Sequence, residues 1–261
     1  MTEQQWRHDR ESVTDAMLEH TKQFVTPLST ETATSIRLVG TGSYVQHEKR
    51  MLITCEHVAR VQPMHYRFLD STNVFAPNGN WTMDEHPIDA AFVPISDSDW
   101  EACTHNAAAV PYSRFAKSHA IVERAELLFF RGYSGENAHY GFNEHLTNGS
   151  GYCSQVKDVA ENAQFFEIFW EPKHTQFTKG TSAEACAAVK FEDPAGFSGS
   201  LVWNTRFLEV SRQNRKWAPK DAVVTGLLRR WDSDTKSLLV WRVEHLRAWL
   251  KAAKNWDTQN L

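Results

Sequence analysis

The spacing of apolar residues is helical at both ends of the chain and strand-like between them. From residue 9 to residue 25 one stripe recurs at helical intervals, and Pro27 follows it. This stripe consists of Val13, Met17, Thr21 and Phe24. A second stripe closes the chain and consists of Val243, Leu246, Leu250 and Ala253. We therefore predict an N-terminal helix that stops before the proline and a C-terminal helix, each packed on one face.

Between these helices, short apolar runs are separated by Gly, Asn, Asp and Pro, which is typical of strands and turns. The runs lie at 35–40, 43–46, 50–55, 65–69, 89–95, 125–133, 165–170, 186–191, 200–203, 221–228 and 237–243. Residues 107–120 have looser spacing and are predicted to connect two groups of strands. We expect an all-β protein of paired barrels or a sandwich. Its segments are a helical extension (1–30), two β units (31–118 and 119–242) and a C-terminal helix with its tail (243–261).

Composition narrows the functional class. The chain has 261 residues, 41% of them hydrophobic and 23% charged, so it can bury a globular core. A net charge of -4 does not favour a nucleic-acid partner, because phosphate binding usually needs a basic excess. No apolar run approaches the roughly 18 residues of a membrane span, and the N-terminus lacks the basic and apolar segments of a leader. We expect no membrane association.

The cysteines and histidines do not indicate a metal site. The cysteines are widely spaced and form no Cys-x-x-Cys pair: Cys55, Cys103, Cys153 and Cys186. Four histidines outside the candidate site also lack metal-ligand spacing: His47, His65, His86 and His174. We expect reduced thiols, a cytoplasmic location, and neither metal nor cofactor.

A serine lies between two glycines in the stretch PAGFSGSLVW (194–203), at the start of an apolar run. Gly and Ser are common in turns, so Ser198 alone does not indicate chemistry. Two upstream segments change this interpretation. His57 follows an apolar strand in LITCEHV, and Asp89 begins another in HPIDAAFV. An acid at the edge of a buried strand is costly unless a group pairs with it, and a histidine is a natural partner.

These residues have the chemistry of nucleophilic catalysis. A serine hydroxyl needs a base within hydrogen-bond reach, and that base needs a third group to fix its tautomer. His57 and Asp89 can fill these roles for Ser198. The backbone N–H groups of Gly196 and Ser198 can form an oxyanion hole, and glycine at 196 allows the required backbone conformation.

Two other serine assignments are weaker. Ser134, in GYSG, follows a strand and is interpreted as a turn residue. An α/β-hydrolase order of Ser198, Asp232 and His245 is also present, but a serine at position 200 replaces the second glycine of the nucleophile motif. The chain also lacks the alternating long helices of that fold.

The segments LITCEHV, IDAAFV and GFSGS, in this order, resemble the chymotrypsin-like (trypsin-fold) serine peptidases. The form of the serine motif, with FFRGYSG before it, is most similar to the bacterial glutamyl endopeptidase and HtrA branches. The resemblance covers residues 35–250 through three short motifs. It implies two antiparallel six-stranded β-barrels, catalytic groups in the cleft between them, and a C-terminal helix behind.

Two positions depart from the family pattern. The animal digestive branch has an aspartate before the serine that receives a new N-terminus on activation, but this chain has Phe197. We therefore expect no zymogen cleavage. Many relatives also have a serine on the late strand that hydrogen-bonds the catalytic aspartate. Here that position falls near Arg229, so Asp89 must be supported in another way.

The sequence therefore predicts a serine endopeptidase that acts on protein or peptide substrates through an acyl-enzyme. Restraint by narrow specificity or by a regulatory partner is expected, because a free protease in the cytosol is hazardous. The alternative is a silent protease fold that binds a partner peptide as an added strand.

The expected substrate pocket combines charges of both signs. The resemblance places Glu192 and Asp193 on one wall, with Arg229 and Arg230 on the other. A carboxylate at the floor selects a basic side chain, and an arginine there selects an acidic one. Glu192 occupies the position of the acidic floor in trypsin-like members, so cleavage after basic residues is favoured. The alternative is that all four charges face solvent or pair with one another.

Overall fold

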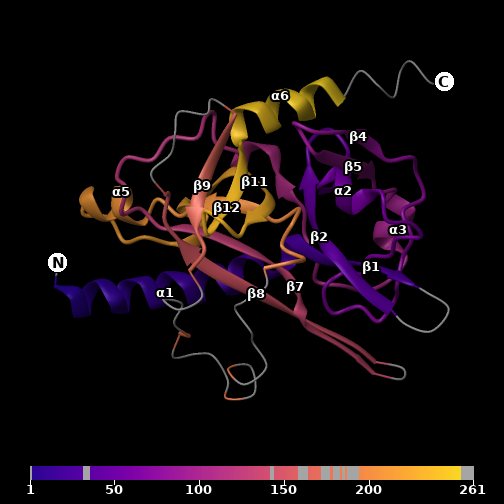
Figure 1. Ribbon diagram of the computed structural model, residues 1–261, viewed down its shortest axis with the longest axis horizontal. Coiled ribbons are helices and arrows are strands. Elements are labelled where there is room, and N and C mark those ends of the chain that lie inside the picture. Colours follow the sequence, from indigo (N-terminus) through magenta and orange to yellow (C-terminus); the bar gives the residue numbers. More distant parts are fainter. Residues whose placement is uncertain are drawn as a thin grey trace.

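The computed structural model describes residues 2–31, 36–141, 144–157, 164–171, 177–178, 183, 186 and 194–253, with backbone only at 135–148. Two six-stranded sheets form the body of the protein (Figure 1). The first sheet contains β1 (Val25–Glu31), β2 (Ile36–Gln46), β3 (Arg50–Thr54), β4 (Thr82–Asp84), β5 (Ala90–Pro94) and β6 (Val110–Pro111). The second contains β7 (Leu128–Gly141), β8 (Glu144–Ser154), β9 (Phe165–Phe169), β10 (Leu201–Asn204), β11 (Val223–Asp232) and β12 (Ser237–Arg242).

The strands pair antiparallel in the orders β1-β2-β3-β5-β4 and β8-β7-β10-β11-β12-β9, while the short β6 runs parallel to β2. The expected all-β class and the two six-stranded sheets are confirmed. The expected closed barrels are not observed, because neither order closes on itself within the described residues.

The segment 65–69, predicted as a strand, does not form one in the structure. It makes only isolated bridges, Ser29 with His65 and Tyr66 with Phe75. Its aromatic side chains pack into a cluster instead, in which Phe68 lies 4.9 Å from Phe75 between ring centroids. The apolar pattern therefore reflects side-chain packing here rather than a continuous ladder.

Helices lie at the two ends of the chain, as predicted. The N-terminal helix α1 (Glu3–Thr21) is followed by η1 (Lys22–Phe24), and the C-terminal helix is α6 (Val243–Ala253). Shorter helical turns lie between strands: α2 (Glu56–Ala59), α3 (Asp97–Glu101), η2 (Tyr112–Arg114), α5 (Phe207–Arg212) and η4 (Pro219–Asp221). No helix among the described residues is long and apolar enough to span a membrane.

Both terminal helices pack on the sheets (Figure 1). Val13 and Met17 of α1 are buried beside β7 and β8, and the Arg131 guanidinium donates to the Leu18 carbonyl over 2.9 Å. Trp249 of α6 contacts Phe92 of the first sheet and also stacks edge-on with a tryptophan of the second. The C-terminal helix therefore ties the two sheets together and holds their relative position at the site between them.

The connection between the sheets contains a half-buried histidine, His119. Its ring stacks on Phe166 with 3.7 Å between centroids, and Nδ1 lies 2.7 Å from Thr225 Oγ1. Burial and the nearby positive charge of Arg242 lower the pKa of His119 to about 4, although the Glu244 carboxylate opposes this. The ring is therefore neutral in the folded protein at pH values where the unfolded chain binds a proton.

We expect His119 to make stability depend on pH. Because its folded pKa lies below the usual value near 6.5, its contribution is complete above pH 6.5 and is lost as pH falls towards about 4. The difference in unfolding free energy between wild type and His119→Gln should narrow over this interval in denaturant titrations. His8→Gln, on the exposed part of α1, is the matched control. A difference that stays constant with pH would contradict the assignment.

Candidate active site

His57 and Asp89 lie next to each other because the end of β3 is adjacent to the start of β5 in the first sheet. β3 pairs with β5 so that Thr54 lies opposite Ala91. The start of α2, just after β3, therefore lies beside the residue that precedes β5. The His57 Nδ1 atom lies 3.0 Å from both Asp89 carboxylate oxygens, and the His57 backbone N–H donates to Asp89 Oδ1 over 3.1 Å. One residue thus holds the carboxylate through two donors.

The environment of this pair favours an ionised carboxylate. The Asp89 side chain is 11% exposed and that of His57 is 49% exposed. Burial acts to raise the pKa of Asp89, but hydrogen bonds and charge from His57, with a smaller effect of Arg229, hold it below its usual value. A carboxylate here keeps the ring proton on Nδ1, so Nε2 is the atom that can accept another proton.

The loop that carries Ser198 is clamped between the two sheets. The Thr41 backbone N–H donates to the Ser198 carbonyl over 3.0 Å, and the Gly199 N–H donates to the Leu228 carbonyl over 2.9 Å. Gly199 has a φ of 95°, and a Cβ there would lie 2.1 Å from the Thr41 carbonyl oxygen. Only glycine fits this crossing, which explains the second glycine of the motif.

Gly196, the first glycine of the motif, has a φ of 104°. Its carbonyl accepts a hydrogen bond from the Thr41 hydroxyl over 2.7 Å. The N–H groups of Gly196 and Ser198 have no acceptor within the part of the chain that the structure describes. Two N–H donors on one tight loop, both without an acceptor among the described residues, are the groups that an oxyanion requires.

The Ser198 hydroxyl donates to the Arg229 carbonyl over 2.7 Å. No hydrogen bond joins it to His57, although both residues are described, and this differs from the arrangement expected of a base and its nucleophile. The two groups are nonetheless neighbours through Cys55. Its Sγ lies 3.8 Å from the Arg229 carbonyl oxygen and within 4.8 Å of a ring nitrogen of His57.

Phe197 anchors the loop in the second sheet. Its side chain is 1% exposed and packs among three aromatic rings. The distances between ring centroids are 5.4 Å to Phe130, 5.5 Å to Tyr152 and 5.8 Å to Trp170. An apolar contact therefore holds the residue before the serine, where the digestive branch of the resembled family uses an aspartate. The pattern of the sequence did not indicate this aromatic cluster.

The four expected pocket residues have different outcomes. Glu192 and Asp193 lie outside the described residues. Arg230 is exposed on β11. Arg229 is only 3% exposed, and its Nη2 atom lies 3.5 Å from Asp89 Oδ2, so its side chain is turned towards the carboxylate. The only sequence signal for this contact was the missing serine on the late strand.

The alternative serine assignments gain no geometric support. Ser134 is buried in β7 rather than placed on the loop beside His57. Asp232 accepts hydrogen bonds from the backbone N–H groups of Asp234 and Thr235 over 2.9 and 3.1 Å. Its carboxylate therefore shapes the turn between β11 and β12.

Cys55, His57 and Asp89 form the one cluster of three metal-type ligands among the described residues. Each of them already has a hydrogen-bond partner, and the Cys55 Sγ donates to the Leu228 carbonyl over 3.3 Å. Burial raises the pKa of Cys55 well above its usual value, and the Asp89 charge adds to this effect. A neutral thiol and a nearby guanidinium do not suit a metal cation, so the donor set fits proton transfer better.

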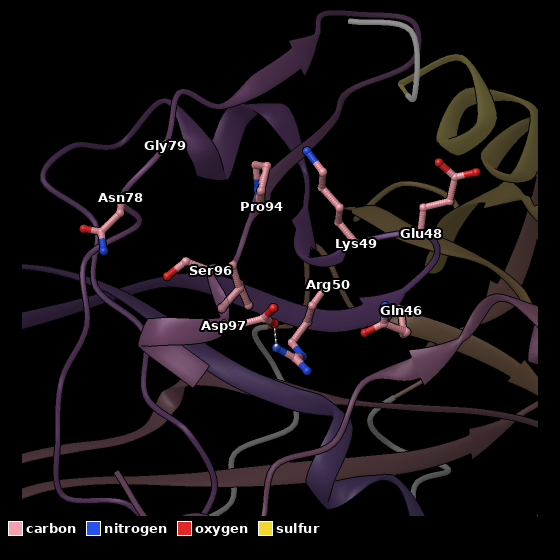
Figure 2. A pocket seen from close by; sticks show the side chains of 10 residues that line it. Gln46, Glu48, Lys49, Arg50, Asn78, Gly79, Pro94, Ser96 and Asp97 are labelled. Atoms are coloured by element: carbon pink, nitrogen blue, oxygen red, sulfur yellow. Dashed lines mark hydrogen bonds and ion pairs between the residues drawn. The ribbon is translucent and has the colours of Figure 1, made fainter. Parts of the chain in front are cut away.

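A separate cavity of about 530 Å³ lies on the first sheet, and Figure 2 shows the side chains that line it. Arg50 and Asp97 form an ion pair of 3.1 Å across it, and the Arg50 guanidinium also lies 4.0 Å above the ring of Trp100. None of its lining residues belongs to the candidate active site. Arg50 and Asp97, two of its charged groups, are thus already paired with each other.

The fold is shared with known proteases. No protein-family model and no curated protein matches the sequence. A serine-to-alanine mutant of Rv3671c from M. tuberculosis, in its inactive form, is similar with a TM-score of 0.54 and 12% identity over 96% of this chain and 95% of that chain. The active form of the Rv3671c protease gives 0.52 and 11% over 88% and 81%, and a structure of GrC gives 0.51 and 11% over 90% and 96%. The chain therefore has the fold of trypsin-like serine proteases.

Proposed function

We propose that this chain is a serine endopeptidase in which Ser198 is the nucleophile and His57 the general base. The proposal is supported by the His57–Asp89 pair at 3.0 Å and by the Ser198 loop, on which two N–H groups have no acceptor among the described residues. A nucleophile, a base with its carboxylate, and two N–H donors are each needed for acyl transfer. The fold shared with serine proteases favours this interpretation of the residues.

The reaction begins with a rotation of the Ser198 side chain. A peptide bound along β11 can donate a backbone N–H to the Arg229 carbonyl, which is the acceptor that the Ser198 hydroxyl occupies now. Displaced from this acceptor, the hydroxyl turns towards His57 Nε2. Catalytic hydrogen bonds are often completed only when substrate binds, so the present geometry suits a resting state.

Catalysis then follows from the residues present. Ser198 Oγ attacks the substrate carbonyl carbon while His57 Nε2 takes its proton, and the oxygen that becomes negative is bound by the N–H groups of Gly196 and Ser198. His57 passes the proton to the leaving amine, and an acyl-enzyme forms. Water then attacks the acyl carbon with His57 again as base, which releases the carboxylic acid and restores Ser198.

The hydrogen bond from the Ser198 hydroxyl to the Arg229 carbonyl also favours a second candidate function. In this candidate the protein has a protease fold without activity and binds a peptide without cleaving it. In this candidate the hydroxyl never leaves the Arg229 carbonyl, and the peptide adds as a strand at a sheet edge. Restraint of an active enzyme by narrow specificity or a regulatory partner in the cytoplasm is a further part of our proposal.

The preference for basic residues remains a prediction from the sequence. With Arg229 turned to Asp89, Arg230 is the remaining arginine of the four expected pocket residues. We expect Glu192→Gln to lower kcat/KM for peptides cleaved after Lys or Arg far more than for neutral peptides. Peptide libraries with a varied residue before the scissile bond measure this. Equal losses on all substrates, or a native preference for acidic residues, would place the specificity on the arginine wall.

The proposed activity is tested by following new N-termini in a mixture of denatured proteins. Wild type should generate them, and Ser198→Ala should not. A set of termini that is unchanged in Ser198→Ala would mean a contaminant or a different nucleophile. Binding of peptides without any cleavage by wild type would instead support the silent fold.

A further inference from the structure

Arg229 is a buried cation at the back of the candidate active site. It lies at an irregularity of the β11–β12 ladder, between Leu228 and Arg230, so two β11 residues span one step of the partner strand. Its guanidinium lies 3.5 Å from Asp89 and 4.7 Å from the centroid of the Phe165 ring. Its carbonyl accepts the Ser198 hydroxyl. One residue thus contacts both the acid and the nucleophile.

Burying this guanidinium is costly, which points to a specific role. The side chain is 4% exposed, and its Nε atom has no hydrogen-bond partner within the described residues. A buried charge with an unmet donor destabilises a protein unless an opposite charge compensates it. Asp89 is the anion in contact with it, so the Asp89 carboxylate compensates for the buried charge of Arg229.

The charges around Asp89 are few. His57 faces it from α2, Cys55 from the end of β3 and Arg229 from β11. The Cys55 thiol is neutral, because burial raises its pKa well above the usual range. Glu56 of α2 is paired with Arg60, which is itself exposed. Among the described groups in contact with Asp89, Arg229 is the one with a permanent positive charge.

We propose that Arg229 is a positioning residue that orients the Asp89 carboxylate and lowers the affinity of the His57–Asp89 pair for protons. A nearby cation opposes the uptake of a proton by this pair, so the pair stays ready to accept the serine proton at lower pH. The consequence for catalysis rests on the proposed function. The electrostatic effect on the pair does not.

The test is a pH titration of the ring carbon resonances of His57 by NMR, assigned with His57→Gln. In Arg229→Met the midpoint at which the pair takes up its proton should rise by about one pH unit or more. Arg229→Lys, which keeps the charge, should restore most of the wild-type midpoint. In turnover assays the acid limb of kcat/KM should move in the same direction, with a loss in kcat and little change in KM.

Arg131→Met is the matched control, because Arg131 is also a largely buried arginine but binds the Leu18 carbonyl of α1. Its midpoint should equal that of wild type. If Arg229→Met does not fold, Arg229→Gln provides the neutral variant. An unchanged midpoint in the neutral variant, or an equal shift in Arg131→Met, would overturn the proposal. If the titration midpoint shifts in the Arg229 variant but the wild-type protein cleaves no peptide, the electrostatic role of Arg229 stands. Only the proposed peptidase activity is then refuted.

Discussion

Replacing Ser198 with alanine should lower peptide turnover by about 10⁴-fold or more while the protein stays folded. The hydroxyl is the only part of the side chain that this change removes, and the backbone bonds that hold the loop between Thr41 and Leu228 remain. His57→Ala should cause a similar loss, because the members of such a triad act as a unit. Initial rates on a cleaved peptide, with near-ultraviolet circular dichroism as a check of folding, measure both effects.

Ser134→Ala is the control for this loss. Ser134 is buried in β7 and follows Gly132 and Tyr133, as Ser198 follows Gly196 and Phe197, so both serines lie in a Gly-aromatic-Ser-Gly sequence. We expect its turnover to stay close to wild type. A folded but inactive Ser134→Ala protein, together with an active Ser198→Ala protein, would show that the nucleophile is assigned to the wrong serine.

Replacing Phe197 with alanine should both destabilise the protein and impair catalysis. Truncation of a fully buried phenylalanine costs about 3–5 kcal/mol of unfolding free energy. The same ring anchors the loop among Phe130, Tyr152 and Trp170, so its loss should also misplace the N–H groups of the oxyanion hole. One misplaced donor costs about 10²–10³-fold in kcat.

Phe68→Ala separates the two effects, because Phe68 is equally buried but belongs to the aromatic cluster of the first sheet. Its unfolding free energy should fall by a similar amount, measured by denaturant titration, with kcat unchanged in native buffer. If both variants lose stability and neither loses kcat, Phe197 contributes only to packing. If both variants lose kcat equally, the loss of turnover is caused by general destabilisation and not by displacement of the Ser198 loop.

The architecture was largely predictable from the sequence because it depends on periodic patterns. Helical stripes at both ends and two groups of short apolar runs correspond to α1, α6 and the two sheets. The pattern missed β1 and β8, and it wrongly predicted a strand at 65–69, where an aromatic-rich run packs by its side chains without a ladder partner. Periodicity describes which face is buried, and it does not specify what the backbone pairs with.

The candidate site was predictable in part. The residue types and their order pointed to His57 and Asp89, and the structure places them 3.0 Å apart. The orientation of the Ser198 hydroxyl depends on an acceptor 31 positions away, at Arg229. The pairing of Arg229 with Asp89 likewise depends on where a ladder irregularity places one side chain. Such contacts arise from tertiary packing, and the only hint of them in the sequence was the missing serine near Arg229.

The central claim is that Ser198 is a nucleophile activated by His57, and a fluorophosphonate ester tests it most directly. The reagent should phosphonylate wild-type protein, and peptide mass spectrometry should place the adduct on Ser198. His57→Ala should not be labelled, and Ser134→Ala should be labelled as strongly as wild type. Wild-type protein that remains unlabelled, or an adduct on Ser134, would contradict the account.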